Sequence, residues 1–189
     1  AIDGRVREPL GNFDGFHLGH QAVVGTALDW AAAEGRPCIV ATFDPHPVRY
    51  FAPEAAPFRL TTLDQRQELF EAAGADAMLV FAFDAELAAL TPEAFARDIL
   101  AAGLGISHVV VGADFCFGKG RAGNARDLAT LCEAKGIRTT IAPLVQQAGA
   151  EISSTHIRKF LTDGHPRDAA AMLGQPAPAL DVPDRKSVV

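Results

Sequence analysis

Two histidines three residues apart follow a glycine-rich stretch near the start of the chain. Residues 11–20 read Gly-Asn-Phe-Asp-Gly-Phe-His-Leu-Gly-His, and apolar spacing predicts a helix from about Leu18 to Ala33. His17 and His20 would share one face of its first turn, where backbone N–H groups lack partners and the helix dipole is positive. This combination favours phosphate binding, so the first hypothesis is a nucleotide site. Zinc is the rival ligand, but no Cys or third His stands at ligand spacing.

A second predicted helix start carries hydroxyl groups and an arginine. Ser153 is the expected N-cap of a helix that runs to Asp163, which leaves Ser154 and Thr155 in its first turn and Arg158 one turn on. Capping accounts for one hydroxyl but not for three hydroxyls and an arginine, whose guanidinium suits bidentate contact with phosphate. We therefore predict a second phosphate contact here.

Two further segments with unusual residues come directly after predicted strands. In residues 43–47, Phe-Asp-Pro-His-Pro, the prolines restrict the backbone at a strand exit, and His46 could simply cap a turn. The segment 112–124 combines glycines with Phe115 and Phe117. A loop of this length is usually functional or disordered. The two rings favour an ordered loop that contacts a planar ligand, although composition alone fits a glycine-rich surface loop equally well.

Strands and helices are expected to alternate along the chain. Short apolar segments typical of buried parallel strands lie at 38–43, 77–83, 106–111 and 138–144. Helices are predicted between them at 62–73, 91–102 and 124–135. The alternation predicts an α/β fold, a Rossmann-like parallel sheet with helices on both faces. Ligands bind beyond the carboxyl ends of the strands in such sheets, and the unusual segments follow strands.

The segment before the glycine-rich stretch fits this sheet poorly. It reads Val-Arg-Glu-Pro-Leu over residues 6–10, and proline is not expected inside a central strand. We therefore expect the first strand to be very short or altered.

Composition limits the class of protein. The chain has 189 residues, 49% of them apolar, which is enough for one substantial core. Its net charge of −6 argues against a general nucleic-acid binder. No apolar run is long enough to span a bilayer, and no signal peptide is evident, so a cytoplasmic protein is expected. The three cysteines fit reduced thiols: Cys38, Cys116 and Cys132.

Four motifs, taken together and in this order, resemble those of prokaryotic FAD synthetases in the nucleotidyltransferase superfamily. Gly11–His20 resembles their H-x-G-H signature and Thr42–Pro47 resembles T-F-x-P-H-P. Gly112–Gly118 resembles G-x-D-F-x-F-G and Ile152–Arg158 resembles I-S-S-T-x-I-R. Family members usually join an FMN adenylyltransferase module to a riboflavin kinase module.

The resemblance implies a domain organisation. An FMN adenylyltransferase domain of the nucleotidyltransferase type would occupy residues 1–174. Residues 175–189 would be a proline-containing tail or truncated linker, without a riboflavin kinase domain.

The resemblance also implies the reaction and the site. The enzyme would transfer the adenylyl group of ATP to FMN, giving FAD and pyrophosphate, by direct attack of the FMN phosphate on the α-phosphorus with Mg²⁺. The catalytic residues would be His17, His20 and Arg158. The ATP-binding residues would be Gly11, Asn12, Phe13, Asp14, Gly19, Ser153, Ser154 and Thr155. The flavin-binding residues would be Phe43, His46, Pro47, Asp114, Phe115, Phe117 and Gly118. Asn12 or Asp14 would lie near Mg²⁺.

Other functions remain open at this point. One alternative is another nucleotidyltransferase, acting on pantetheine phosphate, a pyridine mononucleotide or glycerol phosphate. A second is a flavin- or ATP-binding module without turnover. The expected partners are small-molecule nucleotides, with neither nucleic acid nor membrane, and the sequence does not indicate an oligomeric state.

Overall fold

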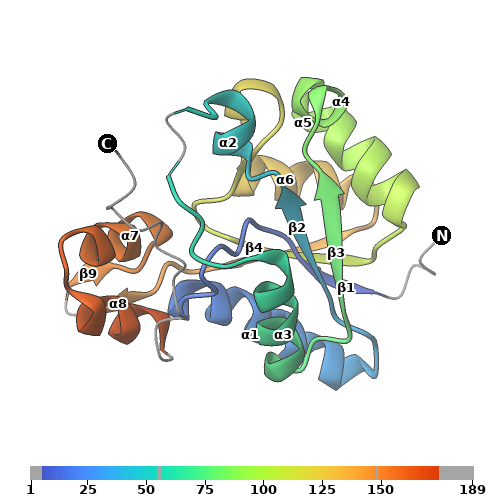
Figure 1. Ribbon diagram of the computed structural model, residues 1–189. Helices are drawn as coiled ribbons and strands as arrows, with labels where there is room; N and C mark the ends of the chain where they lie inside the picture. Colours follow the sequence, from blue (N-terminus) through green and yellow to red (C-terminus); the bar gives the residue numbers. More distant parts are fainter. Residues whose placement is uncertain (1–5, 55–56, 148, 175–189) are drawn as a thin grey trace.

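A parallel sheet between two layers of helices forms the protein. The computed structural model describes residues 6–54, 57–147 and 149–174 (Figure 1). The sheet strands are β1 (Arg7–Pro9), β2 (Ile39–Asp44), β3 (Ala77–Ala82), β4 (His108–Gly112) and β7 (Arg138–Ala142). Parallel pairing places them in the order β3-β2-β1-β4-β7, with β1 and β2 joined by two isolated bridges. The predicted α/β fold with a parallel sheet is confirmed.

The helices connect these strands. They are α1 (Leu18–Glu34), α2 (Pro47–Phe51), α3 (Leu63–Ala73), α4 (Ala85–Ala89), α5 (Pro92–Ala94), the π-helix η1 (Phe95–Leu104), the 3₁₀ turn η2 (Lys119–Arg121), α6 (Ala125–Glu133), α7 (Ser154–Thr162) and α8 (Pro166–Leu173). Two short hairpins complete the described chain: β5 (Cys116–Phe117) with β6 (Gly123–Asn124), and β8 (Gln146–Gln147) with β9 (Ala150–Glu151). The elements α2 and α4 and the two hairpins were not predicted from the sequence.

Alternate residues of the interior strand β4 show that both faces of the sheet are covered. Val109 and Val111 pack in one apolar cluster with side chains of η1 and α6. Val110, between them, packs in a second cluster with side chains of α1 and α3. Successive side chains of a strand point to opposite faces. The predicted helices on both faces are therefore confirmed.

Local signals account for where the helices begin. Thr62 and Gln65 form the predicted capping box at the start of α3. The predicted helix at 91–102 does begin after Thr91 but is α-helical for only three residues before it widens into the π-helix η1. Gly103 permits this wide turn, since a Cβ there would lie 2.9 Å from the Asp98 carbonyl oxygen.

Strand β1 is short, as expected from Pro9, yet it lies at the centre of the sheet. Arg7 N–H donates to the Pro37 carbonyl at 3.0 Å and Gly11 N–H donates to the Ala41 carbonyl at 3.2 Å. Residue 9 falls between these two donors, and proline has no N–H to contribute. The missing donor explains why β1 and β2 meet only at isolated bridges.

The helical pair α7–α8 packs against the beginning of α1 (Figure 1). Leu18 of α1 contacts a cluster that includes Ile157 of α7 and Leu173 of α8. Gln21 Nε2 donates to the Leu173 carbonyl at 2.8 Å. The two helix starts that carry the predicted phosphate contacts are thereby held side by side.

The cysteines and the hydropathy of the helices complete the description of the fold. All three cysteines are free, with Cys38 and Cys132 buried and Cys116 exposed. Over the described ranges, no helix combines the length and apolar character needed to cross a membrane.

Candidate active site

The glycine-rich stretch forms a tight loop between β1 and α1. Phe13 and Phe16 adopt φ angles of 50° and 42°, and Gly15 lies at 84°. Such angles strain residues other than glycine and persist only where packing holds them. Both phenylalanine rings are buried and meet the Phe70 ring of α3 at centroid distances of 5.8 and 5.1 Å. A Cβ at Gly11 would lie 3.1 Å from the Phe13 ring, so a larger residue there would crowd this ring.

His17 and His20 come together as the sequence predicts. Their rings stack with centroids 3.6 Å apart at an interplanar angle of 19°. His17 is the N-cap of α1, and its Nδ1 accepts the His20 backbone N–H at 3.3 Å. One of the amides expected to be free is thus capped by His17 itself. Gly19 allows this arrangement, since a Cβ there would lie 3.1 Å from the His17 ring.

Both imidazoles are held in the neutral form. Burial lowers the pKa of His17 to about 4, and the nearby Asp14 carboxylate only partly opposes this. Burial, reinforced by His17 and by arginine charges, lowers the pKa of His20 well below its ordinary value. Because Nδ1 of His17 accepts a hydrogen bond, its proton at neutral pH resides on Nε2. His17 therefore offers a neutral N–H donor.

Asp14 ties the loop to two other parts of the chain. Its buried carboxylate accepts hydrogen bonds from the backbone N–H groups of Leu60 and Thr61 at 3.0–3.2 Å and from the Thr61 hydroxyl at 3.2 Å. Arg158 of α7 donates to the same carboxylate through Nη2 and forms an ion pair with it. The Ser154 hydroxyl donates to the Asp14 carbonyl at 2.8 Å. Asp14 thus fixes the loop relative to α7.

Arg158 is held in place from both sides. In addition to the ion pair with Asp14, its Nε donates to the Phe58 carbonyl at 2.8 Å. Only 12% of its side chain is exposed. Ser153 caps α7 as predicted by accepting the His156 N–H at 3.3 Å, and Thr155 is exposed on the first turn. The second predicted phosphate contact therefore lies directly beside the glycine-rich loop.

Asn12 is better suited than Asp14 to approach a metal ion. Thr42 Oγ1 and Arg66 Nη1 donate to the Asn12 carbonyl at 2.9 and 3.1 Å, which fixes its backbone. Its side-chain Oδ1 is buried and has no hydrogen-bond partner among the described residues. Both oxygens of Asp14 are already engaged. In the described ranges, no three His, Cys, Asp or Glu side chains cluster as a metal site.

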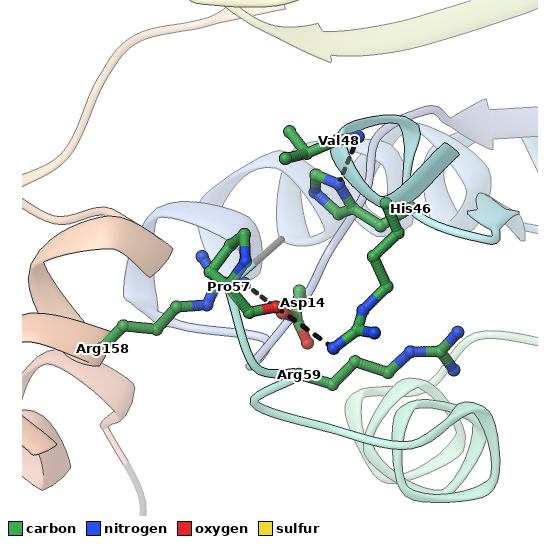
Figure 2. A pocket seen from close by; sticks show the side chains of 7 residues that line it. Asp14, His46, Val48, Pro57, Arg59 and Arg158 are labelled. Atoms are coloured by element: carbon green, nitrogen blue, oxygen red, sulfur yellow. Dashed lines mark hydrogen bonds and ion pairs between the residues drawn. The ribbon is translucent and has the colours of Figure 1, made fainter. Parts of the chain in front are cut away.

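A small pocket joins these elements to the segment after β2. It is lined by Asp14, His46, Val48, Arg49, Pro57, Arg59 and Arg158. Figure 2 shows Arg158 entering from α7, Arg59 from the segment before α3 and His46 from the start of α2. Three arginines therefore line the pocket, opposed by Asp14 and by Asp44, which pairs with Arg59, and this excess of positive charge suits an anion.

His46 caps α2 and also faces this pocket. Its Nδ1 accepts the Val48 N–H at 3.1 Å, with Pro47 in the first turn of the helix. Burial lowers its pKa, an effect opposed by Asp14 and reinforced by Arg158. The capping role that the sequence left undecided is confirmed, and His46 stays a predicted ligand contact.

The predicted flavin-binding phenylalanines share one apolar cluster. Phe43, Phe115 and Phe117 all belong to it, so the structure brings the ends of β2 and β4 together. Phe117 is only 7% exposed, because it packs on Phe95 at a centroid distance of 5.4 Å and stacks on Phe115 at 5.8 Å. Its ring therefore contributes to the core more than to an open surface. The segment 112–124 contains the hairpin strands β5 and β6 with η2 between them.

The remaining predicted flavin contacts occupy the edge of this segment. Asp114 is exposed, and its side chain lies where a Cβ on Gly112 would come within 2.8 Å. Gly118 has a φ of 76° and lies against Pro92 of α5. The glycines shape the turn, and the roles of these residues toward a ligand stay predictions.

Sequence reasoning missed several residues that build the site. Arg66 is buried in α3 and supports Asn12, while Arg59 pairs with Asp44 at 2.9 Å. Tyr50 and Phe51 of α2 present exposed rings that contact Phe83 at centroid distances of 5.4 and 5.8 Å. Aromatic residues a few positions after the motif at 42–47 could have signalled the last pair. No pattern in the neighbouring sequence indicates that Arg66 belongs to the site.

Comparison with known proteins decides the family. Residues 5–156 match the FAD synthetase family model. The chain belongs to the FAD synthetase family. It is 38% identical over 168 residues to a bifunctional riboflavin kinase/FMN adenylyltransferase of Listeria monocytogenes, and 35% identical over 167 residues to the one of Escherichia coli. Both matches cover 88% of this chain and 53% of the relative.

Other relatives extend the comparison. A Listeria monocytogenes protein named FAD synthetase is 35% identical over 169 residues, covering 88% of this chain and 68% of the relative. A Streptococcus pneumoniae structure titled as a macrolide-efflux protein superposes with a TM-score of 0.79 at 27% identity, covering 93% of this chain and 56% of that one. The chain therefore spans about half the length of the two bifunctional relatives that it matches.

Proposed function

We propose that this chain transfers the adenylyl group of ATP to FMN, forming FAD and pyrophosphate, and that residues up to 174 form the adenylyltransferase domain. Membership of the FAD synthetase family and relatives named FMN adenylyltransferase support this proposal. The observation that carries it is the Asp14 connection, which sets the stacked histidines of α1 beside Arg158 of α7. Residues 175–189 lie outside the described residues.

The proposed reaction needs no covalent enzyme intermediate. An FMN phosphate oxygen forms a bond to the α-phosphorus of ATP, while the bond from that phosphorus to the bridging oxygen breaks. The electron pair leaves with pyrophosphate, and no proton has to move. Catalysis of this kind consists of positioning and charge stabilisation.

In this proposal the residues of the loop and of α7 act on the triphosphate. His17 donates from Nε2–H, and the neutral, half-buried ring of His20 stacks on it. Arg158 supplies positive charge to the leaving pyrophosphate, with Ser153, Ser154 and Thr155 on the same helix start. Because Asp14 and the Phe58 carbonyl already orient Arg158, little reorganisation is needed when substrate binds.

For a magnesium ion, the site offers one side-chain oxygen, that of Asn12. Mg²⁺ binds through substrate phosphates and water with few protein ligands, and it neutralises phosphate charge when bound. The Oδ1 of Asn12, which has no hydrogen-bond partner among the described residues, is an oxygen of the required kind. Asp14 acts instead by holding the loop and Arg158.

The aromatic surface at the ends of β2 and β3 supports a flavin as acceptor. Tyr50 and Phe51 expose their rings next to Phe83, and Phe51 is 65% exposed. Flat aromatic rings at a surface offer stacking area to a planar ligand such as isoalloxazine. His46 and Arg49 lie on the same short helix start and face the anion pocket.

The test is to incubate the purified chain with ATP, Mg²⁺ and FMN and to measure FAD by chromatography and pyrophosphate by a coupled assay. We expect equal amounts of both products. Pantetheine phosphate, nicotinamide mononucleotide and glycerol phosphate serve as competing acceptors. Pyrophosphate release with one of these but not with FMN would assign another transferase activity. Folded protein that binds FMN without releasing pyrophosphate would refute catalysis.

A further inference from the structure

A second group of arginines lies at the amino ends of the sheet strands, opposite the carboxyl ends where the candidate active site lies. Arg7 begins β1, Arg36 precedes β2 and Arg138 begins β7. With Glu34 and Ser107 they line a cavity of about 320 Å³. These residues stand at the amino ends of parallel strands, whereas the glycine-rich loop follows a carboxyl end. The length of the sheet therefore separates the two places.

The sheet register places the basic side chains in one row. Arg7 of β1 is the partner of His108 in β4, and His108 is the partner of Arg138 in β7. Residues paired in this way point to the same face of a sheet. Here it is the face covered by α1, where the Arg138 guanidinium lies 5.3 Å from the Trp30 ring centroid. Two of the arginines are thus set by backbone pairing rather than by chance on a flexible surface.

Positive charge in this group exceeds negative charge. Arg7 pairs with Glu34 through Nη2, Arg138 Nη1 lies 3.2 Å from the same carboxylate and Arg36 Nε lies 3.5 Å from it. Counted over the described residues, three guanidinium groups against one carboxylate leave a charge of +2 in this group, within a chain whose net charge is −6. Burial and the charges of Arg36 and Arg138 lower the pKa of Arg7, which reflects this excess.

Arg7 keeps hydrogen-bonding capacity in a buried position. Its side chain is 4% exposed and lines the cavity, and its Nη1 donates to Ser107 Oγ at 2.8 Å. Its Nε is buried and finds no partner in the part of the chain that the structure describes. Buried polar groups are normally satisfied, so an unused guanidinium donor beside a cavity points to an absent acceptor.

We propose that this cavity is a second anion site that binds a small phosphate anion, either inorganic phosphate or pyrophosphate. Guanidinium groups recognise phosphate oxygens through paired N–H donors, and the cavity has the size of a small-ligand pocket. Arg7, Arg36 and Arg138 supply the charge, and Ser107 supplies a hydroxyl. The inference does not depend on the adenylyl transfer proposed above.

The single tryptophan of the chain reports on this site. Trp30 contacts Arg138, so binding there should change its fluorescence. Pyrophosphate and inorganic phosphate are titrated separately, at constant ionic strength, into the full chain and into Arg158→Gln. The Arg158→Gln variant weakens binding at the candidate active site. We expect a saturable change in fluorescence in both proteins. The anion with the lower Kd is identified as the ligand, and calorimetry checks the affinity.

Three variants test the assignment. Arg36→Gln should weaken binding about tenfold or more, because it removes one charged donor. Arg97→Gln, on η1 and paired with the adjacent Asp98, is the matched control and should leave the affinity unchanged. Glu34→Gln removes the internal competitor and should tighten binding. A purely structural ion-pair cluster would show no anion binding in any of these proteins.

Four results would overturn the proposal. They are no saturable fluorescence change with either anion, a change that disappears in Arg158→Gln, an affinity that survives Arg36→Gln, or an equal loss in Arg97→Gln. Adenylyl transfer by Arg36→Gln should stay at the level of the parent chain. The two proposals can therefore fail separately.

Discussion

Replacing Glu8 by leucine should stabilise the protein and remove much of its sensitivity to alkaline pH. Glu8 lies in the central strand β1 with 0% of its surface exposed. Its partner in β4 is Val109, so its side chain points to the face covered by η1 and α6. Neither carboxylate oxygen has a hydrogen-bond partner within the described ranges. Burial therefore raises the pKa of Glu8 to about 8.

The size of the effect follows from the pKa difference. The ordinary value of 4.5 applies to the unfolded chain, and the folded state binds its proton up to about pH 8. A group whose pKa is raised on folding stabilises the folded state fully below the unfolded value, and this stability is lost as pH rises toward the folded value. At pH 7, Glu8 lowers the free energy of unfolding by about 3 kcal/mol relative to acidic pH. Between pH 5 and pH 9, this loss of stability grows by about 4 kcal/mol.

Urea unfolding at pH 5, 7 and 9 measures this contribution. The free energy of unfolding of Glu8→Leu should exceed that of the parent chain, and the difference should grow by about 4 kcal/mol from pH 5 to pH 9. Glu68→Leu, the same change at an exposed position of α3, is the matched control and should change the free energy of unfolding little. A Glu8→Leu difference that is constant from pH 5 to 9 would refute the raised pKa. If Glu8→Leu is less stable than the parent chain at pH 9, the Glu8 carboxylate is not buried without a partner.

Three further predictions concern the candidate active site. His20→Ala should lower the kcat of FAD formation by about 10²-fold, as for loss of a preorganised donor, and an unchanged kcat in steady-state assays would remove it from the mechanism. The NMR titration of His17 should show a midpoint near pH 4, with the neutral form throughout pH 6–8. Because the pKa of His17 falls on folding, its contribution to stability is lost as pH drops below 6.5. A midpoint at 6.5 would contradict the burial of His17. Asp14→Asn should lower the free energy of unfolding by about 3 kcal/mol, since it leaves the Arg158 guanidinium without its charge partner, and urea unfolding that matches the parent chain would disprove the clamp.

Local patterns in the sequence determined the elements and the functional motifs. Thr62 with Gln65 marks the start of α3 because both hydrogen bonds of a capping box form within four residues. His17 and His20 share a helix face because their spacing is close to one turn. The alternation of strands and helices predicts the parallel sheet and its helical layers. Each of these depends on residues close together along the chain, so a single sequence is sufficient.

Only the tertiary structure decided which partners those residues meet. Asp14 is read from the sequence as a candidate metal neighbour, yet its contacts to Thr61 and Arg158 span 47 and 144 positions. The buried Arg66 and the row formed by Arg7, His108 and Arg138 likewise depend on which strands and helices become neighbours. Such long-range pairing is set by the packing of the whole sheet, and no local pattern of residue types encodes it.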